Sequence, residues 1–131
     1  VDLCNELKSK YNVKTEYIVV DFGKIEQTYD GYYNIFGKYF QDREISILVN
    51  NVGTLEFKSQ LELTLDEAAS TINLNCYPQT FLSKMFVDVR KQKGAIINLS
   101  SIAAEYVILH QNMYGATKRF NDYLSMGYAL E

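Results

Sequence analysis

The chain has 131 residues, a length typical of one domain with a buried core. Its composition is 47% hydrophobic and 22% charged, which excludes a disordered, collagen-like or low-complexity protein. The 13 basic and 16 acidic residues give a net charge of −3, so we expect no nucleic-acid partner. One Pro and seven Gly are too few for the turns of an all-β protein.

Secondary-structure signals alternate along the chain. Short apolar runs rich in β-branched residues predict three strands, at 15–20, 45–49 and 95–99. Longer amphipathic stretches predict four helices, at 1–11, 25–41, 64–92 and 111–131. A weaker apolar run at 106–109 is interpreted as a loop. The order α-β-α-β-α-β-α is typical of an α/β fold with a parallel sheet and flanking helices.

The third predicted helix carries its own boundary signals. Thr64 and Glu67 are three residues apart and form a capping box at its start. Gly94 is expected to cap its end at Gln92.

Pro78 lies inside this predicted helix. It has no N–H to donate to the carbonyl of Leu74, so we expect a kink between residues 74 and 79. We further expect the kink to expose the carbonyl of Asn75, a residue discussed below.

Cysteine and histidine are scarce. The two cysteines, Cys4 and Cys76, cannot form a disulfide framework, and with the single histidine, His110, they lack the paired spacing of a zinc site. We therefore expect free buried thiols and no bound metal, and we interpret His110 as a solvated loop residue. No apolar run approaches the ~20 residues that a membrane-spanning helix needs.

Small and polar residues follow each predicted strand. They are Asp21-Phe22-Gly23, Asn50-Asn51-Val52-Gly53 and Ser100-Ser101. Ligands of a parallel sheet bind outside the carboxyl ends of its strands, so we expect a binding site at these residues. Ordinary strand-to-helix turns use the same residue types, and this pattern alone leaves both interpretations open.

Tyr114 and Lys118 are four residues apart on the last predicted helix and therefore share a face. An ammonium beside a phenol favours the phenolate, so such a tyrosine can exchange a proton with a carbonyl or an alcohol. With 11 tyrosines in the chain, one pair at this spacing is expected by chance. The spacing gains meaning only from Ser101, which ends a predicted strand thirteen residues before Tyr114.

Three motifs occur in one order along the chain: ILVNNVG, GAIINLSS and YGATK. In this order and spacing they resemble the short-chain dehydrogenase/reductase family. The opening ELKSKYNVKTEYIVVDF and the form VNNVG are similar to the branch of very-long-chain 3-oxoacyl-CoA reductases and type 12 17β-hydroxysteroid dehydrogenases. The resemblance covers essentially the whole chain.

The resemblance implies four catalytic residues. Tyr114 would give or take the proton, and Lys118 would favour its phenolate and bind the nicotinamide ribose. Ser101 would polarise the substrate carbonyl and stabilise the developing oxyanion. Asn75 would hold a water in a proton relay toward Lys118.

The resemblance also implies a nicotinamide cofactor, NADP(H) in preference to NAD(H), without a metal. Asp21 would lie near the adenine, with backbone contacts from Phe22. Asn50 and Gly53 would shape the turn beside the cofactor. The cofactor-binding residues expected in this way are Asp21, Phe22, Asn50, Asn51, Gly53, Tyr114 and Lys118.

The implied fold is a Rossmann-like sheet of which residues 1–131 are the central part of a single domain. Its first two strands, its Gly-rich turn and its C-terminal part would be missing, and no G-x-G occurs among the seven glycines. In the strand order 3-2-1-4-5-6 the two missing strands lie between 15–20 and 45–49. We therefore expect 45–49 to pair in parallel with 95–99 and 15–20 to pair with neither, and we expect the chain as given to be inactive.

For the complete protein the resemblance implies an NAD(P)H-dependent oxidoreductase that acts on a small-molecule ketone or acyl-CoA. The substrate would be a 3-oxoacyl-CoA of fatty-acid elongation or a steroid ketone, with Tyr114 as proton donor. The resemblance also implies association with the endoplasmic reticulum membrane, with the cytoplasm as the alternative, and a possible homodimer through the helices that carry Asn75 and Tyr114.

Two other interpretations stay open at this point. One is a catalytically inactive dehydrogenase-like binding or scaffold module, or a non-functional fragment. The intact Ser101, Tyr114 and Lys118 argue against the scaffold module, which need not keep all three. The other is a different doubly wound fold such as a flavodoxin-like one, which gives no reason for a Ser thirteen residues before Tyr-x-x-x-Lys.

Overall fold

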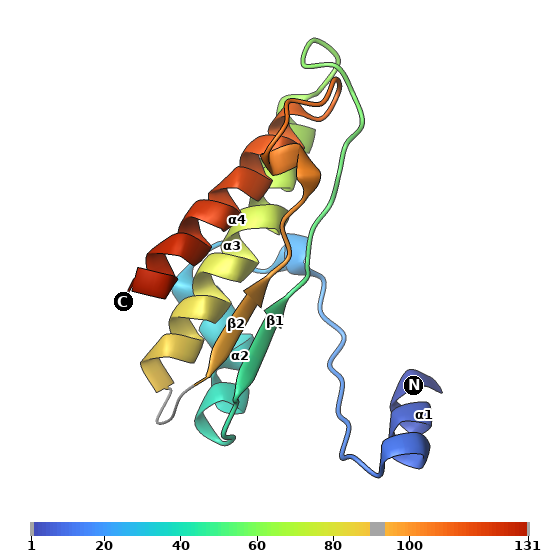
Figure 1. Cartoon of the computed structure of the whole chain (residues 1–131), viewed down its shortest axis with the longest axis vertical. Coiled ribbons are helices and arrows are strands. Elements are labelled where there is room, and N and C mark those ends of the chain that lie inside the picture. The colour runs from blue at the N-terminus through green and yellow to red at the C-terminus, as the bar shows by residue number, and fades with distance from the viewer. Residues whose placement is uncertain (1, 90–93, 131) are drawn as a thin grey trace.

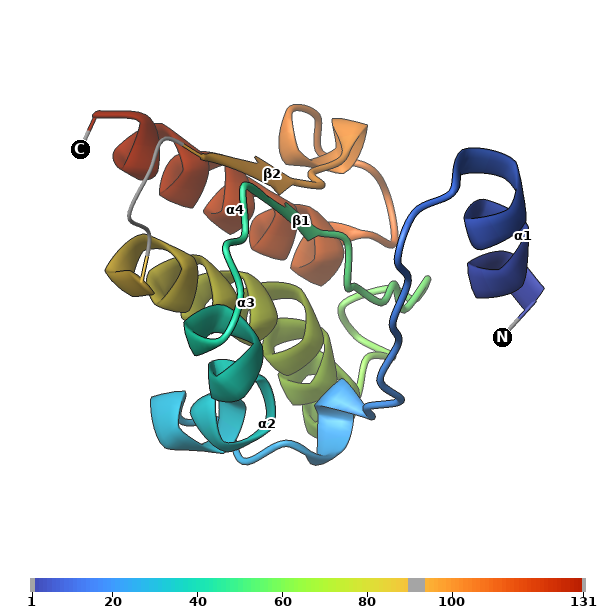
Figure 2. The same cartoon turned by 90° about the horizontal axis from the view of Figure 1, so that it is seen from below.

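A computed structural model describes residues 2–89 and 94–130 and shows a small parallel sheet with helices on one face. The described strands are β1 (Ile47–Asn50) and β2 (Ala95–Asn98), and the described α-helices are α1 (Asp2–Tyr11), α2 (Tyr29–Gln41), α3 (Leu65–Val89) and α4 (Asn112–Leu130). Two short 3-10 helices, η1 (Phe22–Lys24) and η2 (Ile102–Ala104), follow the first extended segment and β2. Helices α3 and α4 lie against the sheet, α2 packs on α3, and α1 stands apart (Figures 1 and 2).

The sheet confirms the predicted pairing of the second and third apolar runs. β1 and β2 are parallel neighbours, with Ile47 opposite Ala95 and Asn50 opposite Asn98. Alternate residues point to opposite faces, so Leu48 and Ile96 pack on the helices. On the other face, apolar side chains remain exposed in the part of the chain that is described: Ile47, Val49, Ile97 and Leu99.

The prediction of a strand at 15–20 is wrong. These residues, all of them described, carry no strand assignment and run without a partner from α1 to η1 (Figure 1). A strand needs the hydrogen bonds of a neighbour, and 15–20 pairs with neither β1 nor β2, as expected. Val19 consequently leaves 90% of its surface exposed.

Helix α1 forms where it was predicted, but it buries nothing. All ten of its residues are described and none is buried; Leu3 and Tyr11, part of the predicted apolar face, are exposed. Two hydrogen bonds connect it to the segment that follows: the N–H of Asn12 donates to the carbonyl of Lys8 at 3.0 Å, and Thr15 Oγ1 donates to the carbonyl of Cys4 at 3.2 Å.

Helix α2 begins at Tyr29 rather than at residue 25. Thr28 caps it by accepting a hydrogen bond from the N–H of Gly31 at 3.1 Å. A Cβ at position 31 would lie 2.2 Å from the carbonyl oxygen of Glu26, so only glycine fits this turn. The helix contributes Tyr32 and Phe40 to the apolar core. The other members are Ile25, directly after η1, and Leu82, Met85 and Phe86 of α3.

Helix α3 confirms its predicted start. The N–H of Thr64 donates to Glu67 at 3.0 Å and that of Glu67 donates to Thr64 Oγ1 at 3.2 Å, which is a complete capping box. The helix is described to Val89; the predicted end at Gln92 lies outside the described residues, and Gly94 directly precedes β2.

Helix α3 continues through Pro78 without interruption, from residue 65 to residue 89. The unbroken course counts against the idea that a kink exposes the Asn75 carbonyl. Pro78 is buried, as are its neighbours Leu82 and Met85, so packing holds the helix where one hydrogen bond is missing.

Helix α4 forms as predicted up to Leu130, and residues 106–109 form a loop as expected. The helix is pressed against η2, because a Cβ at Gly115 would lie 2.5 Å from the carbonyl oxygen of Ala103. Glycine at this position therefore allows the segment after β2 to touch the first turn of α4.

Candidate active site

Lys118 is a buried ammonium on α4, with 5% of its surface exposed. Its Nζ donates a hydrogen bond of 2.7 Å to the carbonyl of Leu99, directly after β2. Burial lowers the pKa of Lys118 from its ordinary 10.5, while Cys76 and Asp122 act in the opposite direction. The bond to Leu99 uses one of three N–H groups, so the others are free to act on a second partner.

Tyr114 lies one turn before Lys118 on the same face, as the sequence predicts. The Lys118 Nζ is 5.7 Å from the centre of the Tyr114 ring. The backbone carbonyl of Tyr114 accepts a hydrogen bond of 2.7 Å from Thr117 Oγ1, and the tyrosine is half-buried. The structure therefore brings the predicted phenol and ammonium together at the start of α4.

Ser101 caps η2 at the end of β2. Its Oγ accepts a hydrogen bond from the N–H of Ala103 at 3.2 Å, so its own O–H is left to donate elsewhere. The neighbouring Ser100 donates its hydroxyl to the carbonyl of Lys118 at 3.3 Å. With the close contact of Gly115 on Ala103, these bonds attach the Ser101 segment to the turn of α4 that carries Tyr114.

Asn75 is fully buried on α3 and uses both ends of its amide. Its Oδ1 accepts from the N–H of Thr54 at 2.7 Å, and its Nδ2 donates to the carbonyl of Thr54 at 3.0 Å and to Thr117 Oγ1 at 2.9 Å. Asn75 thus ties the loop after β1 to both long helices.

Gly53 joins Asn75 to Lys118. A Cβ at position 53 would lie 3.1 Å from Asn75 Oδ1, tighter than most real contacts, and 3.4 Å from Lys118 Nζ, at ordinary van der Waals distance. Asn75, Gly53 and Lys118 therefore form one cluster beyond the carboxyl ends of β1 and β2. A side chain at position 53 would fill the space beside the ammonium, so glycine suits a ligand that approaches the backbone there.

The remaining predicted cofactor residues lie in different surroundings. Asn50 is buried and points to the helices, where its Nδ2 donates to Ser83 Oγ at 3.0 Å and to Asn98 Oδ1 at 2.8 Å. Asn51, the next residue, is exposed. Asn50 therefore shapes the turn from inside, while Asn51 lies on the accessible side.

Asp21 and Phe22 lie at η1, and their contacts in the structure are local. Asp21 caps η1 by accepting from the N–H of Gly23 at 3.0 Å, and it pairs with Lys24 at 3.5 Å. Phe22 stacks on Phe36 of α2, with ring centres 5.7 Å apart. The structure does not bring these two residues into the Asn75–Gly53–Lys118 cluster.

The sequence analysis missed Thr117 and Thr54. Thr117 accepts from Asn75 and donates to the Tyr114 carbonyl, so it connects two predicted site residues. The signal for Thr117 was available, because it lies inside YGATK three residues after the tyrosine. Thr54 bonds Asn75 through its backbone N–H and carbonyl, which nearly every residue has, so its residue type gave no signal.

His110 is not the solvated residue that was expected. It has a left-handed backbone, with φ 66°, and is half-buried. Its ring lies 5.6 Å from the ring of Phe57, and its carbonyl accepts a hydrogen bond of 3.2 Å from the N–H of Lys58. His110 therefore joins the loop after β1 to the loop before α4, at the upper end of Figure 1.

Both cysteines are free and half-buried rather than buried. Burial raises the pKa of the Cys76 thiol to about 11, against a lowering effect of Lys118. Within residues 2–89 and 94–130 no group of three His, Cys, Asp or Glu side chains could hold a metal ion. Among the described helices, none combines the length and hydropathy needed to cross a membrane.

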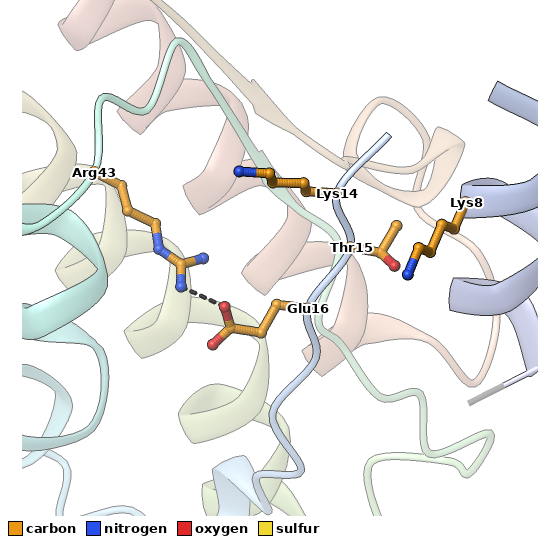
Figure 3. Close-up of a pocket in the computed structure, with 5 residues that line it drawn as sticks. All are labelled: Lys8, Lys14, Thr15, Glu16 and Arg43. Carbon is orange, nitrogen blue, oxygen red and sulfur yellow. Dashed lines mark hydrogen bonds and ion pairs between the residues drawn. The ribbon is translucent and has the colours of Figure 1, made fainter. Parts of the chain in front are cut away.

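A basic groove of about 620 Å³ lies elsewhere, beside the extended segment that follows α1 (Figure 3). It is lined by Lys8, Lys14, Thr15, Glu16 and Arg43. Arg43 forms an ion pair with Glu16. The groove contains none of the predicted site residues.

Residues 1–131 match the sequence model of the family described as short chain dehydrogenase. The chain belongs to this family. The match confirms the predicted family, and the parallel sheet with flanking helices confirms the predicted Rossmann-like α/β fold class.

Individual short-chain dehydrogenases are similar over most of the chain. The very-long-chain 3-oxoacyl-CoA reductase of Anas platyrhynchos is 30% identical over 131 residues, which cover 95% of this chain and 41% of that protein. The hydroxysteroid dehydrogenase-like protein 1 of Gallus gallus is 33% identical over 123 residues, which cover 91% of this chain and 36% of that protein. The chain thus spans about two fifths of the length of these curated relatives.

A solved structure shares the fold. The bulky-bulky ketone specific alcohol dehydrogenase of Comamonas testosteroni superposes with a TM-score of 0.85 at 24% identity, over 98% of this chain and 51% of that one. The described strands and helices therefore share the fold of about half of that alcohol dehydrogenase.

Proposed function

We propose that the protein containing this chain is an NAD(P)H-dependent carbonyl reductase or hydroxy dehydrogenase in which Tyr114 donates the proton. The observation that carries the proposal is the cluster of Asn75, Gly53 and the buried Lys118 beside Tyr114. Such a cluster offers a proton donor, a fixed positive charge and an open backbone at one place.

A bound nicotinamide supplies the hydride, and this chain's residues handle the proton and the charge. Tyr114 gives its phenolic proton to the oxygen of the carbonyl as that oxygen gains charge. Lys118 stabilises the resulting phenolate through its ammonium, and its free N–H groups are suited to ribose hydroxyls. Because Leu99 holds the ammonium in place, this charge needs no reorganisation during the reaction.

Ser101 is proposed to bind the same carbonyl oxygen. Its Oγ is occupied as an acceptor by Ala103, which leaves its O–H as a donor toward the developing oxyanion. Asn75 is proposed to hold the relay water. Its Nδ2 uses both N–H groups on Thr54 and Thr117, while its Oδ1 accepts one hydrogen bond from Thr54 and has a second lone pair for the water.

The proposed cofactor site uses Gly53 and Asn51 on the accessible side of the loop after β1, with Asn50 holding that loop from within. Asp21 and Phe22 are proposed to lie near the adenine. We propose NADP(H) in preference to NAD(H), in line with the resemblance to the reductase branch. Residues 1–131 are proposed to be the central part of one Rossmann-like domain.

The similarity to the relatives supports further proposals about the substrate, the location and the oligomeric state of the complete protein. By analogy with the reductase of Anas platyrhynchos, the substrate is proposed to be a 3-oxoacyl-CoA, with a steroid ketone as the second candidate. The complete protein is proposed to associate with the endoplasmic reticulum membrane and to form a homodimer through α3 and α4.

The test is the Tyr114→Phe variant of the full-length protein, assayed by NADPH oxidation with a 3-oxoacyl-CoA and with a steroid ketone. The variant keeps the ring but loses the proton, so turnover should fall at least a thousandfold while the cofactor Kd changes less than threefold. Retained turnover in the variant would refute Tyr114 as the donor. A wild-type protein that binds NADPH without turnover would favour an inactive binding module.

A further inference from the structure

Helix α3 buries a seam of polar side chains along the face that meets α4. Four residues spaced by four make this seam, and each is at most 1% exposed: Thr71, Asn75, Gln79 and Ser83. Buried polar groups are stable only when they are hydrogen-bonded, so each member of the seam needs a partner.

Two levels of the seam have partners across the interface. At the upper level Asn75 bonds Thr117, 42 positions later, at 2.9 Å. Eight residues further along each helix, Ser83 is linked to Ser125 through Asn50 and Asn98, with hydrogen bonds of 3.0, 2.8 and 2.7 Å. The two helices therefore keep one register over this length, since they lie side by side on one face of the sheet and both run opposite to its strands (Figure 1).

The level between them holds two primary amides, Gln79 and Asn121. The same offset of 42 places Gln79 of α3 opposite Asn121 of α4. Both are fully buried, and within the described residues neither the oxygen nor the nitrogen of either amide has a hydrogen-bond partner. Asn50, whose Nδ2 donates to Ser83 of the next level, has a buried Oδ1 that is also without a hydrogen-bond partner among the described residues.

We infer that Gln79 and Asn121 pair their amides across the α3–α4 interface and act as positioning residues for Lys118. Each amide carries a donor and an acceptor, and rotation about its last torsion exchanges the two, so the pair is self-complementary. The atoms are closed off from solvent, which cannot supply the missing partners. The remaining N–H groups have the Oδ1 of Asn50 as an acceptor.

The pair lies one helical turn from the proposed active site. Gln79 follows Asn75 by four residues, and Asn121 follows Lys118 by three. A bond at this level prevents α4 from sliding along α3, so it holds the ammonium at its distance from Asn75 and Gly53. The pairing itself is independent of the proposed function, whereas the positioning rests on it.

The experiment is a swap of the two amides in the full-length protein. Gln79→Asn shortens one side and Asn121→Gln lengthens the other, and the double variant restores the combined reach. Each single variant should lower the equilibrium constant for folding about tenfold, and the double should recover to within about threefold of wild type. Asn34→Gln, on the exposed side of α2, is the matched control and should change neither folding nor turnover.

The kinetic readout separates positioning from stability. In each single variant kcat should fall at least fivefold at unchanged KM for NADPH, and the swapped double variant should regain it. Additive losses of stability in the double variant would overturn the pairing. A rescued stability with kcat unaltered in all three variants would overturn the positioning alone. If wild type shows no turnover, the proposed function fails while the folding measurements still decide the pairing.

If the amide-swap variants do not fold, leucine variants at the same two positions test the pairing instead. Leucine at both positions replaces the pair by apolar groups of similar size, which is tolerated far better than leaving one amide alone. The double variant Gln79→Leu, Asn121→Leu should therefore be more stable than either single leucine variant. A double variant less stable than both singles would also overturn the pairing.

Discussion

Replacing Asn75 by alanine should loosen the link between the loop after β1 and the two long helices. The substitution removes hydrogen bonds of 2.7, 3.0 and 2.9 Å and leaves the N–H and carbonyl of Thr54 and the hydroxyl of Thr117 without that partner. At about 0.5–1.5 kcal/mol for each bond, the free energy of unfolding should fall by about 2–4 kcal/mol.

Urea denaturation of the full-length protein, followed by circular dichroism at a helix wavelength, measures this loss. Asn73→Ala is the matched control, because it makes the same substitution two positions away on α3 and should change the free energy by less than about 0.5 kcal/mol. An Asn75→Ala variant as stable as the Asn73→Ala control would refute the assignment of Asn75 as the connecting residue.

Two further substitutions test other parts of the site. Gly53→Ala should reduce turnover and destabilise the fold by about 1–2 kcal/mol, because the new Cβ crowds Asn75 Oδ1 and fills the space beside Lys118. Gly127→Ala is the control: with open space around it, it should leave stability unchanged or raise it by up to about 1 kcal/mol, and equal effects of the two substitutions would contradict the crowding at Gly53. Burial raises the pKa of Cys76 from 9.0 to about 11, so the folded protein keeps a thiol proton that the unfolded chain releases. The contribution of this thiol to the free energy of unfolding is therefore full below pH 9 and is lost as the pH rises from 9 to 11. Wild type should therefore lose up to about 2 kcal/mol more than Cys76→Ala over that range in denaturation curves, and parallel pH profiles would contradict the burial of the thiol.

Local sequence patterns were enough to predict most of the fold. The parallel pairing of the second and third apolar runs, the capping box of α3 and the loop at 106–109 follow from residue period and short-range chemistry. The segment 15–20 has the composition of a strand but no neighbouring strand among the described residues, and composition alone does not supply one. Pro78 does not interrupt α3, because burial of its neighbours holds the helix.

The candidate site was predictable only in part, for a similar reason. The resemblance to the family pointed to Asn75, Gly53 and Lys118 on three separate segments, and the structure brings these three together. Thr117 and the amides of Gln79 and Asn121 depend on how α3 meets α4, which no single helix reveals in its own sequence. His110 was misjudged because its partners, Phe57 and Lys58, lie on a loop more than fifty residues earlier.

The central claim is that the complete protein reduces a carbonyl with the proton of Tyr114. Its most direct test is to incubate the full-length protein with deuterium-labelled NADPH and a 3-oxoacyl-CoA or a steroid ketone, and to analyse the product by mass spectrometry. The account predicts one deuterium on the carbon that bears the new hydroxyl in wild type, and no product with Tyr114→Phe. Absence of labelled product from wild type, or the same labelled product from Tyr114→Phe, would contradict it.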